Sequence, residues 1–351
     1  MRRPASLALA VLASLAAFHQ PAIARERVHF IAADDVLWNY APQTRDVISG
    51  NPLRPEAAAQ LGWTYHKAVY RAYTDATFAS LAPIPPSERY RGLVGPTIHA
   101  EVGDTVVVVF RNRTQVPVDI APSGVASIPK PAAVMPGSTR TFRWPVTAAD
   151  GPGAADGSSV LFAYSSDVQQ TPDENAGLIG PLVITRKGSA RADGSPADVD
   201  REITTLFSSQ AEPRSALVQE NVRDRAINPK GIAPASKTFF VDNVFPSING
   251  YVYGNMPLPQ MRAHDRVRWY LLSTMNDIDG HAPTWDGQTV LYQGNRSDSI
   301  GLVTMHVLVD MVPDDPGIWL LKCSFNIHLA AGMEARYEVE PRESKAPAAK
   351  E

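Results

Sequence analysis

The chain alternates short apolar runs with turn-forming residues, a pattern that is typical of β-strands. The clearest run covers residues 106–110, which are rich in valine and directly follow a Gly103-Asp104 turn. β-Branched and aromatic residues favour extended backbone because their side chains pack well on a pleated sheet. Further runs of this kind cover residues 178–184, 238–244 and 267–272. We predict a strand at each of these runs.

Segments with a helical pattern are few. Residues 54–61 and 214–222 are the candidates, and both are short. The chain also contains 30 prolines and 23 glycines, which agrees with many tight connections between strands. The sequence therefore predicts an all-β protein.

A change in composition divides the chain. Residues 186–200 are polar or small and contain no run that could form a core, as is typical of a linker or a long surface connection. We predict an N-terminal domain over 25–187, a linker over 188–200 and a C-terminal domain over 201–342. Each domain has a size that suits one β-sandwich. Residues 343–351 predict a polar tail. Comparable turns before a strand in both domains are a weak sign of duplication.

The first 24 residues have the features of a secretory signal peptide. Arg2 and Arg3 give a positive start, and residues 7–17 form an apolar stretch that is too short to span a bilayer. The small residues Ala22 and Ala24 then offer a cleavage site. We expect an exported protein, periplasmic or secreted, without membrane insertion. A retained anchor is the less favoured alternative.

Charge and cysteine content narrow the function. Cleavage after residue 24 would remove two of the 33 basic residues and none of the 36 acidic residues, which leaves a net charge of −5. This balance does not favour nucleic-acid binding. Cys323 is the single cysteine, so no disulfide can form within the chain. An unpaired thiol in an oxidising compartment is a liability unless it is buried or bound, which points toward a metal.

The segment 319–339 has the spacing Cys-x4-His-x4-Met, with Cys323, His328 and Met333. Blue (type 1) copper sites use one thiolate, two imidazoles and a weak axial thioether, because soft sulfur ligands favour Cu(I) while imidazole also suits Cu(II). His281, about forty residues upstream, is the candidate second imidazole. These residues alone leave an alternative open. Cys323 could be only a small buried hydrophobe, in a spacing that arose by chance.

Motifs along nearly the whole predicted mature chain resemble the ceruloplasmin and hephaestin family of multicopper oxidases. They include GLVGP at 92–96, GLIGPL at 177–182, SINGY at 247–251 and DMVPD at 310–314. The resemblance implies two tandem cupredoxin-like Greek-key β-sandwich domains, of which the N-terminal one has no copper ligands. It also implies one type 1 copper ion, with the ligands His281, Cys323, His328 and Met333.

The resemblance fails at the family's second copper centre. The trinuclear cluster, where oxygen is reduced, needs eight histidines in four His-x-His pairs. The matching positions hold Ala121 and Ser123, Ser165 and Asp167, Thr284 and Asp286, and Lys322 and Ser324. None is histidine, so neither a four-electron oxidase nor a nitrite-reductase-like centre is expected. Binding of a different cation by Asp167 and Asp286 stays open.

These inferences favour a one-electron carrier or redox relay, whose partner is a redox protein or a small reductant. Periplasmic copper binding or delivery, weak oxidation of metal ions or phenols through the type 1 site, and a structural module are the alternatives. Small two-domain relatives often form trimers because their cluster sits between subunits, so a homo-oligomer such as a trimer stays open, although the loss of the cluster residues weakens that reason. The remaining histidines of the predicted mature chain are expected to be structural or exposed: His29, His66, His99, His264 and His306.

Overall fold

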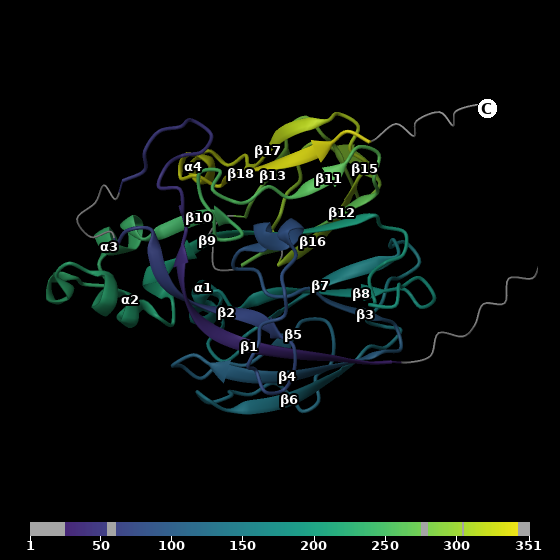
Figure 1. Ribbon diagram of the computed structural model, residues 1–351, viewed down its shortest axis with the longest axis horizontal. Coiled ribbons are helices and arrows are strands. Elements are labelled where there is room, and N and C mark those ends of the chain that lie inside the picture. Colours follow the sequence, from purple (N-terminus) through teal and green to yellow (C-terminus); the bar gives the residue numbers. More distant parts are fainter. Residues whose placement is uncertain (1–24, 55–60, 275–279, 304, 343–351) are drawn as a thin grey trace, which may run out of the picture.

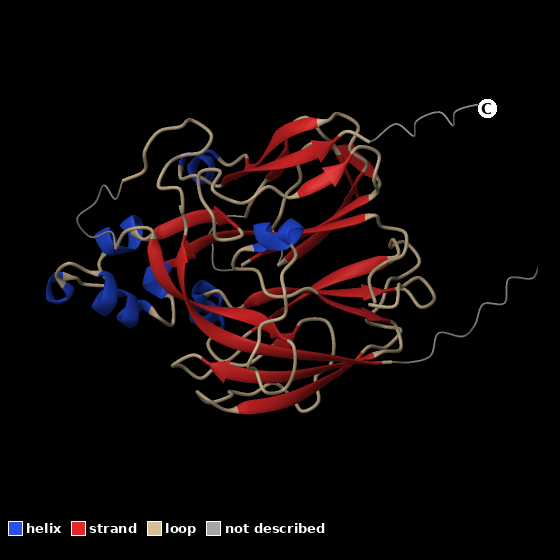
Figure 2. Ribbon diagram, viewed as in Figure 1, coloured by secondary structure: helices blue, strands red, loops and turns tan. Residues whose placement is uncertain are grey.

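A computed structural model describes residues 25–54, 61–274, 280–303 and 305–342. Strands predominate and form four sheets stacked as layers, while the helices are short (Figures 1 and 2). The predicted all-β class is therefore confirmed. The predicted signal peptide, the predicted tail and most of the helix candidate at 54–61 lie outside the described residues. No helix in the described ranges is long and apolar enough to cross a membrane.

Two four-stranded sheets form the N-terminal half, at the bottom of Figure 1. The outer sheet has the order β2-β1-β4-β6, with β1 (Glu26–Asn39), β2 (Thr64–Tyr73), β4 (Thr105–Arg113) and β6 (Thr139–Pro145). The inner sheet has the order β3-β8-β7-β5, with β3 (Ile98–Glu101), β5 (Ala121–Pro122), β7 (Ser159–Ser165) and β8 (Ile179–Thr185). A buried core that includes Phe110, Trp144 and Tyr164 lies between them.

Two sheets also form the C-terminal half. The inner sheet has the order β10-β9-β12-β16-β14-β15, with β9 (Arg201–Ala211), β10 (Val244–Ile248), β12 (Val267–Ser273), β14 (Val290–Tyr292), β15 (Asn295–Ser297) and β16 (His306–Met311). The outer sheet has the order β11-β18-β17-β13, with β11 (Gln260–Arg262), β13 (Pro283–Trp285), β17 (Gly317–Cys323) and β18 (Glu334–Glu340). Trp269, Trp285 and Tyr337 belong to the core between these two sheets.

The two halves repeat one pattern of strand pairing. β1 pairs in parallel with β4, and β9 pairs in parallel with β12. β3 pairs in parallel with β8, and β11 pairs in parallel with β18. In each of the four sheets the second strand of the parallel pair also pairs with an antiparallel strand. These antiparallel pairs are β4–β6, β12–β16, β8–β7 and β18–β17. The duplication that the sequence only hinted at is thus visible in the order and direction of the strands.

The structure corrects one predicted strand and shifts one predicted helix. Strands were expected at 106–110, 178–184 and 267–272, and β4, β8 and β12 confirm them. Residues 238–244, also expected to be a strand, instead form helix α3 (Lys237–Asp242) and the first residue of β10. The side chain of Ser236 accepts a hydrogen bond from the Phe239 amide, and this N-cap outweighs the strand propensity of the apolar run.

The remaining helical elements are also short. The helix expected at 214–222 begins later, as α2 (Val218–Arg225), and α1 and α4 cover Gln170–Ala176 and Asn326–Ala330. Three 3₁₀ turns are η1 (Pro86–Arg91), η2 (Glu212–Arg214) and η3 (Pro229–Gly231).

The segment predicted as a linker forms a compact connection. The Arg191 guanidinium donates hydrogen bonds to the carbonyls of Pro196, Ala197 and Val199, at 2.6, 3.3 and 2.5 Å. The Thr185 hydroxyl donates to the Gly194 carbonyl at 2.8 Å. These bonds hold the connection against the end of β8, so it does not behave as a flexible tether.

The inner sheets of the two halves pack on each other through apolar side chains. Leu161 and Val183 of the N-terminal half lie in one buried cluster with Leu206, Tyr270 and Leu272 of the C-terminal half. This apolar contact joins the two inner sheets, which are neighbouring layers in the middle of the stack (Figure 1).

A buried ion pair crosses the same junction. The Lys67 ammonium, on β2, lies 2.7 Å from a carboxylate oxygen of Glu212, on η2, and both side chains are almost fully buried. The ammonium also donates to the Asn175 carbonyl at 2.5 Å and to Gln210 Oε1 at 3.1 Å. The Tyr40 hydroxyl donates to the same Glu212 oxygen at 2.5 Å. The charge of Lys67 is therefore satisfied by groups from both halves.

Removing one member of this pair should destabilise the protein strongly, since the other charge would remain buried and unpaired. We expect Lys67→Ala to lower the free energy of unfolding by about 3–5 kcal/mol, measured by urea denaturation. Arg266→Ala is the matched control, because Arg266 pairs with Asp200 on the surface and should matter little. Equal, small losses for both variants would contradict a structural role for the buried pair.

Candidate metal centre

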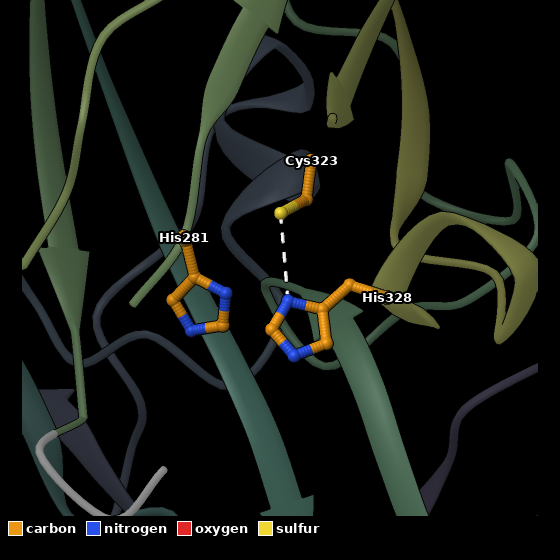
Figure 3. Close-up of side chains that lie close together, drawn as sticks. All are labelled: His281, Cys323 and His328. Atoms are coloured by element: carbon orange, nitrogen blue, oxygen red, sulfur yellow. Dashed lines mark hydrogen bonds between the residues drawn. The ribbon is translucent and has the colours of Figure 1, made fainter. Parts of the chain in front are cut away.

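Three of the four predicted ligands meet at one end of the C-terminal half. One ligand atom each of His281, Cys323 and His328 lies within 4.8 Å of the others, and all three residues are buried. Figure 3 shows both imidazoles and the sulfur directed toward a common point. His281 lies just before β13, Cys323 is the last residue of β17, and His328 lies in α4. Residues that lie far apart in the sequence, from β17, α4 and the segment before β13, therefore converge.

The fourth predicted ligand, Met333, is tied to the same point by its backbone. The Cys323 amide donates to the Met333 carbonyl at 3.0 Å, and the Met333 amide donates to the His328 carbonyl at 2.9 Å. Met333 is fully buried and immediately precedes β18. The loop from β17 to β18 thus closes on itself and carries Cys323, His328 and Met333 on one short stretch.

The surroundings of the Cys323 sulfur favour a thiolate. Burial on its own would raise the pKa of this thiol, but hydrogen bonds from His281, His328 and backbone amides outweigh burial and lower the pKa to about 6. The Ala282 amide lies 3.3 Å from the sulfur, and His328 Nδ1 lies 3.5 Å from it (Figure 3). A thiolate beside two imidazoles is a set of ligands that binds copper in preference to harder metals. The residues therefore fit the metal that the sequence implies.

The positions that match the family's trinuclear cluster lie on or next to neighbouring strands. In the C-terminal half their side chains bond to each other. In the C-terminal half, the Lys322 ammonium lies 2.7 Å from an Asp286 carboxylate oxygen. The hydroxyls of Thr284 and Ser324 lie 2.6 Å apart. In the N-terminal half, Ala121 of β5 pairs with Ser165 of β7. The side chains that stand in for histidines in the C-terminal half are thus satisfied by one another.

The N-terminal half contains the same loop without the metal ligands. The Asp119 amide donates to the Ser166 hydroxyl at 3.1 Å, as the Ala282 amide does to Cys323. The Leu178 amide donates to the Asp173 carbonyl at 3.1 Å, as Met333 does to His328. Ser166, Asp173 and Leu178 therefore stand where Cys323, His328 and Met333 stand in the other half. The sequence reasoning missed this correspondence, because the loop after β7 is longer than the loop after β17.

The other candidate residues do not form a second metal group. Among the described residues, the one cluster of three or more potential ligands from histidine, cysteine, aspartate and glutamate is that of His281, Cys323 and His328. Asp167 accordingly joins no such cluster, and Asp286 is paired with Lys322. His66 lies beside Asp35 and Asp224. His99, at 3.1 Å from Glu202, also serves as a structural partner.

Known proteins resemble this chain both in the region of the candidate site and along most of its length. A family model described as multicopper oxidase matches residues 264–343, which contain all four predicted ligands. The chain is 34% identical to human "Ferroxidase HEPHL1" over 347 residues, covering 92% of this chain and 30% of that protein. It is also 34% identical to human "Ceruloplasmin", covering 89% of this chain and 32% of that protein. The chain is a ceruloplasmin- and hephaestin-like multicopper oxidase family member.

Membership of this family implies copper binding. The chain spans about a third of the length of these curated relatives, so similarity to them does not establish that it has their activities. Among solved structures, one titled "Crystal structure of multicopper oxidase" superposes with a TM-score of 0.58 at 16% identity, covering 90% of this chain and 89% of that chain. That likeness confirms the predicted cupredoxin-like fold of two tandem sandwiches.

The glycine in the ligand loop offers a test of how tightly the loop is built. Gly332 has a φ of 91°, and a Cβ there would lie 2.7 Å from the Tyr253 ring. We expect Gly332→Ala to lower the free energy of unfolding of the copper-free protein by more than about 1 kcal/mol. Gly301→Ala is the control, since a Cβ at Gly301 would meet open space. If urea denaturation gave equal midpoints for the two variants, the loop would be less constrained than described.

The aspartate that stands in the place of His328 should leave a pH signature. Burial raises the pKa of Asp173 to about 6, although hydrogen bonds from Ser166 and the Gln169 amide act in the opposite direction. The folded state therefore binds this proton more tightly than the unfolded state, whose aspartates titrate near pH 3.9. It follows that Asp173 makes stability fall as the pH rises from about 4 to about 6.

Asp173→Asn should remove this contribution, so that the slope of unfolding free energy against pH becomes less negative in that window. Urea denaturation at a series of pH values would measure it. Asp200→Asn is the control, because Arg266 lowers the pKa of Asp200 to about 2, below the window. An identical slope in wild type and Asp173→Asn would show that Asp173 titrates normally.

Proposed function

We propose that this chain is a mononuclear type 1 copper protein that carries one electron at a time. The proposed ligands are His281, Cys323, His328 and Met333. The observation that carries the proposal is the convergence of a buried, easily ionised thiol with two buried imidazoles. Copper bound by such ligands cycles between Cu(I) and Cu(II), and so accepts and releases single electrons.

A single copper, rather than an oxygen-reducing set, is supported by what occupies the other positions. Histidines on either side of the thiolate would be needed to relay electrons onward, and those positions hold Lys322 and Ser324. Lys322 is held by Asp286, and Ser324 by Thr284. An ammonium group cannot ligate a metal, because it has no lone pair. We therefore propose an electron carrier and not a four-electron oxidase.

Electron exchange is proposed to occur through the ligand loop. His328 is buried, but Phe325 and Ile327 beside it are 41% and 64% exposed. The Phe325 ring lies 6.0 Å from the His328 ring, centroid to centroid. Apolar side chains here keep water from the imidazole and offer a surface that a redox partner protein or a small reductant could approach. The signal-like first 24 residues lead us to propose that the protein works after export, in the periplasm or outside the cell.

The test is a visible absorption and EPR spectrum of the Cu(II)-loaded protein, with copper counted per chain. We expect an intense thiolate-to-copper band, the narrow hyperfine splitting of type 1 copper, and one copper per chain. Cys323→Ser should abolish the band while the protein stays folded, because a hydroxyl is a poor copper ligand. His66→Gln is the matched control, since His66 lies away from the site and should leave the band intact.

Two outcomes would contradict the proposal. A thiolate band that survives in Cys323→Ser would show that the ligand assignment is wrong. More than one tightly bound copper, together with rapid oxygen consumption in the presence of a reductant, would show that an oxygen-reducing centre exists after all.

A further inference from the structure

The N-terminal half contains a large cavity that the copper chemistry does not use. Its volume is about 710 Å³, within the range of sites that bind small molecules. It lies between the paired strands β1 and β2 and a strap, residues 81–96, in the connection from β2 to β3. Tyr251 and Pro257 of the C-terminal half complete the lining.

The strap is anchored at both ends, so the cavity is part of the folded structure. At one end the Ala82 amide donates to the Ala72 carbonyl at 2.9 Å. At the other end the Leu93 amide donates to the Asn249 carbonyl at 3.1 Å, and the Asn249 side chain donates to the Tyr90 carbonyl at 2.9 Å. A cavity with fixed walls can bind a ligand without first paying for the ordering of a loop.

The lining is mainly apolar and aromatic. Leu37, Leu81 and Ile84 line it and are 62%, 39% and 65% exposed, so three large aliphatic side chains are exposed within one cavity. Trp38 and Tyr251 also line it, and their rings meet edge to face with centroids 4.9 Å apart. Covering such a surface with an apolar body lowers the free energy, because apolar area is removed from water.

The charged groups of the lining are mostly positive. They are Arg71, Arg89 and Arg91, against the single acid Glu88. Glu88 is already paired with Arg201, at 2.5 Å, so it does not neutralise the three arginines. Arg71 has a long contact of 3.5 Å with Asp34. In the described part of the chain no ion pair or hydrogen bond involves the side chain of Arg89. The Arg91 guanidinium donates through Nη2 to the Gly95 carbonyl, and its Nε is buried without a partner.

We infer that this cavity is a binding site for a small organic anion with an apolar body, such as a carboxylate or a sulfonate. The apolar part lies against Leu37, Leu81 and Ile84, and the anionic group pairs with Arg89 and Arg91. Guanidinium groups suit this role because they bind planar carboxylates in a bidentate manner. The inference does not depend on the copper site or on the function proposed for it.

Decanoate is the probe, and decanol is its uncharged counterpart. Titration of the copper-loaded protein would be followed by calorimetry and by the fluorescence of the tryptophans, one of which, Trp38, lines the cavity. We expect saturable binding of one decanoate per chain, and binding of decanol that is weaker by about tenfold or more, because decanol lacks the charge that pairs with the guanidinium groups.

Three variants locate the site. Arg89→Gln should weaken decanoate binding about tenfold and leave decanol binding unchanged, since it removes a charge and little apolar surface. Ile84→Asn should weaken both ligands. Arg262→Gln, on the exposed strand β11, is the matched control and should bind both ligands as the wild type does.

Equal affinity for decanoate and decanol would overturn the inference, as would wild-type binding by Arg89→Gln and Ile84→Asn. Absence of saturable decanoate binding, together with co-sedimentation of the protein with anionic phospholipid vesicles, would also overturn it. That result would assign the same exposed residues to a membrane surface.

Discussion

The structure depends on polar groups buried where its two halves meet. A buried ammonium or carboxylate is tolerable only when it is fully paired, and the partners of Lys67 come from both halves: Tyr40 and Asn175 from one, Gln210 and Glu212 from the other. The halves therefore cannot separate or slide without leaving a charge in an apolar interior. Together with the apolar contact between the inner sheets, this constraint joins the halves into one frame. The strap is bonded to both halves, at Ala72 and Asn249, and the Tyr253 amide donates to the Gly332 carbonyl of the ligand loop at 2.8 Å.

Much of the fold could be predicted from the sequence because many strands have a recognisable pattern within a short stretch of residues. The valine run within β4 and the apolar runs at β8 and β12 need no distant information to be recognised. The error at residues 238–244 has a local cause as well. The apolar run suggested a strand, but a single serine at position 236 caps the chain into a helix before β10 begins. The division into domains remains a prediction, while the repeat of strand pairing could only be read from the three-dimensional arrangement.

The candidate site was predictable for a different reason. Cys323, His328 and Met333 lie close together in the sequence, so their spacing carries chemical meaning. His281 was a candidate from its place upstream of them, and the resemblance to a known family pointed to the same residue. The residues that replace the trinuclear cluster could be read from the sequence, but not the contacts that they make with one another. Whether Lys322 meets Asp286, and Thr284 meets Ser324, depends on the register between β13 and β17. The cavity was equally hidden, because its lining comes from β1, β2, the strap and the C-terminal half, and no single stretch carries its pattern.

The loop after β7 shows what the loop after β17 requires. In the N-terminal half the same turn closes around Ser166, Asp173 and Leu178, with a glycine at φ 116° where the other half has Gly332. No metal ligand is needed to shape it. The scaffold of the proposed copper site is therefore shaped by the backbone and its hydrogen bonds, which the N-terminal half forms without these ligands. In such a protein, substitution of three or four side chains on an unchanged backbone is enough to create or remove a metal centre. Two halves of one chain can thus follow separate evolutionary paths while sharing a single architecture.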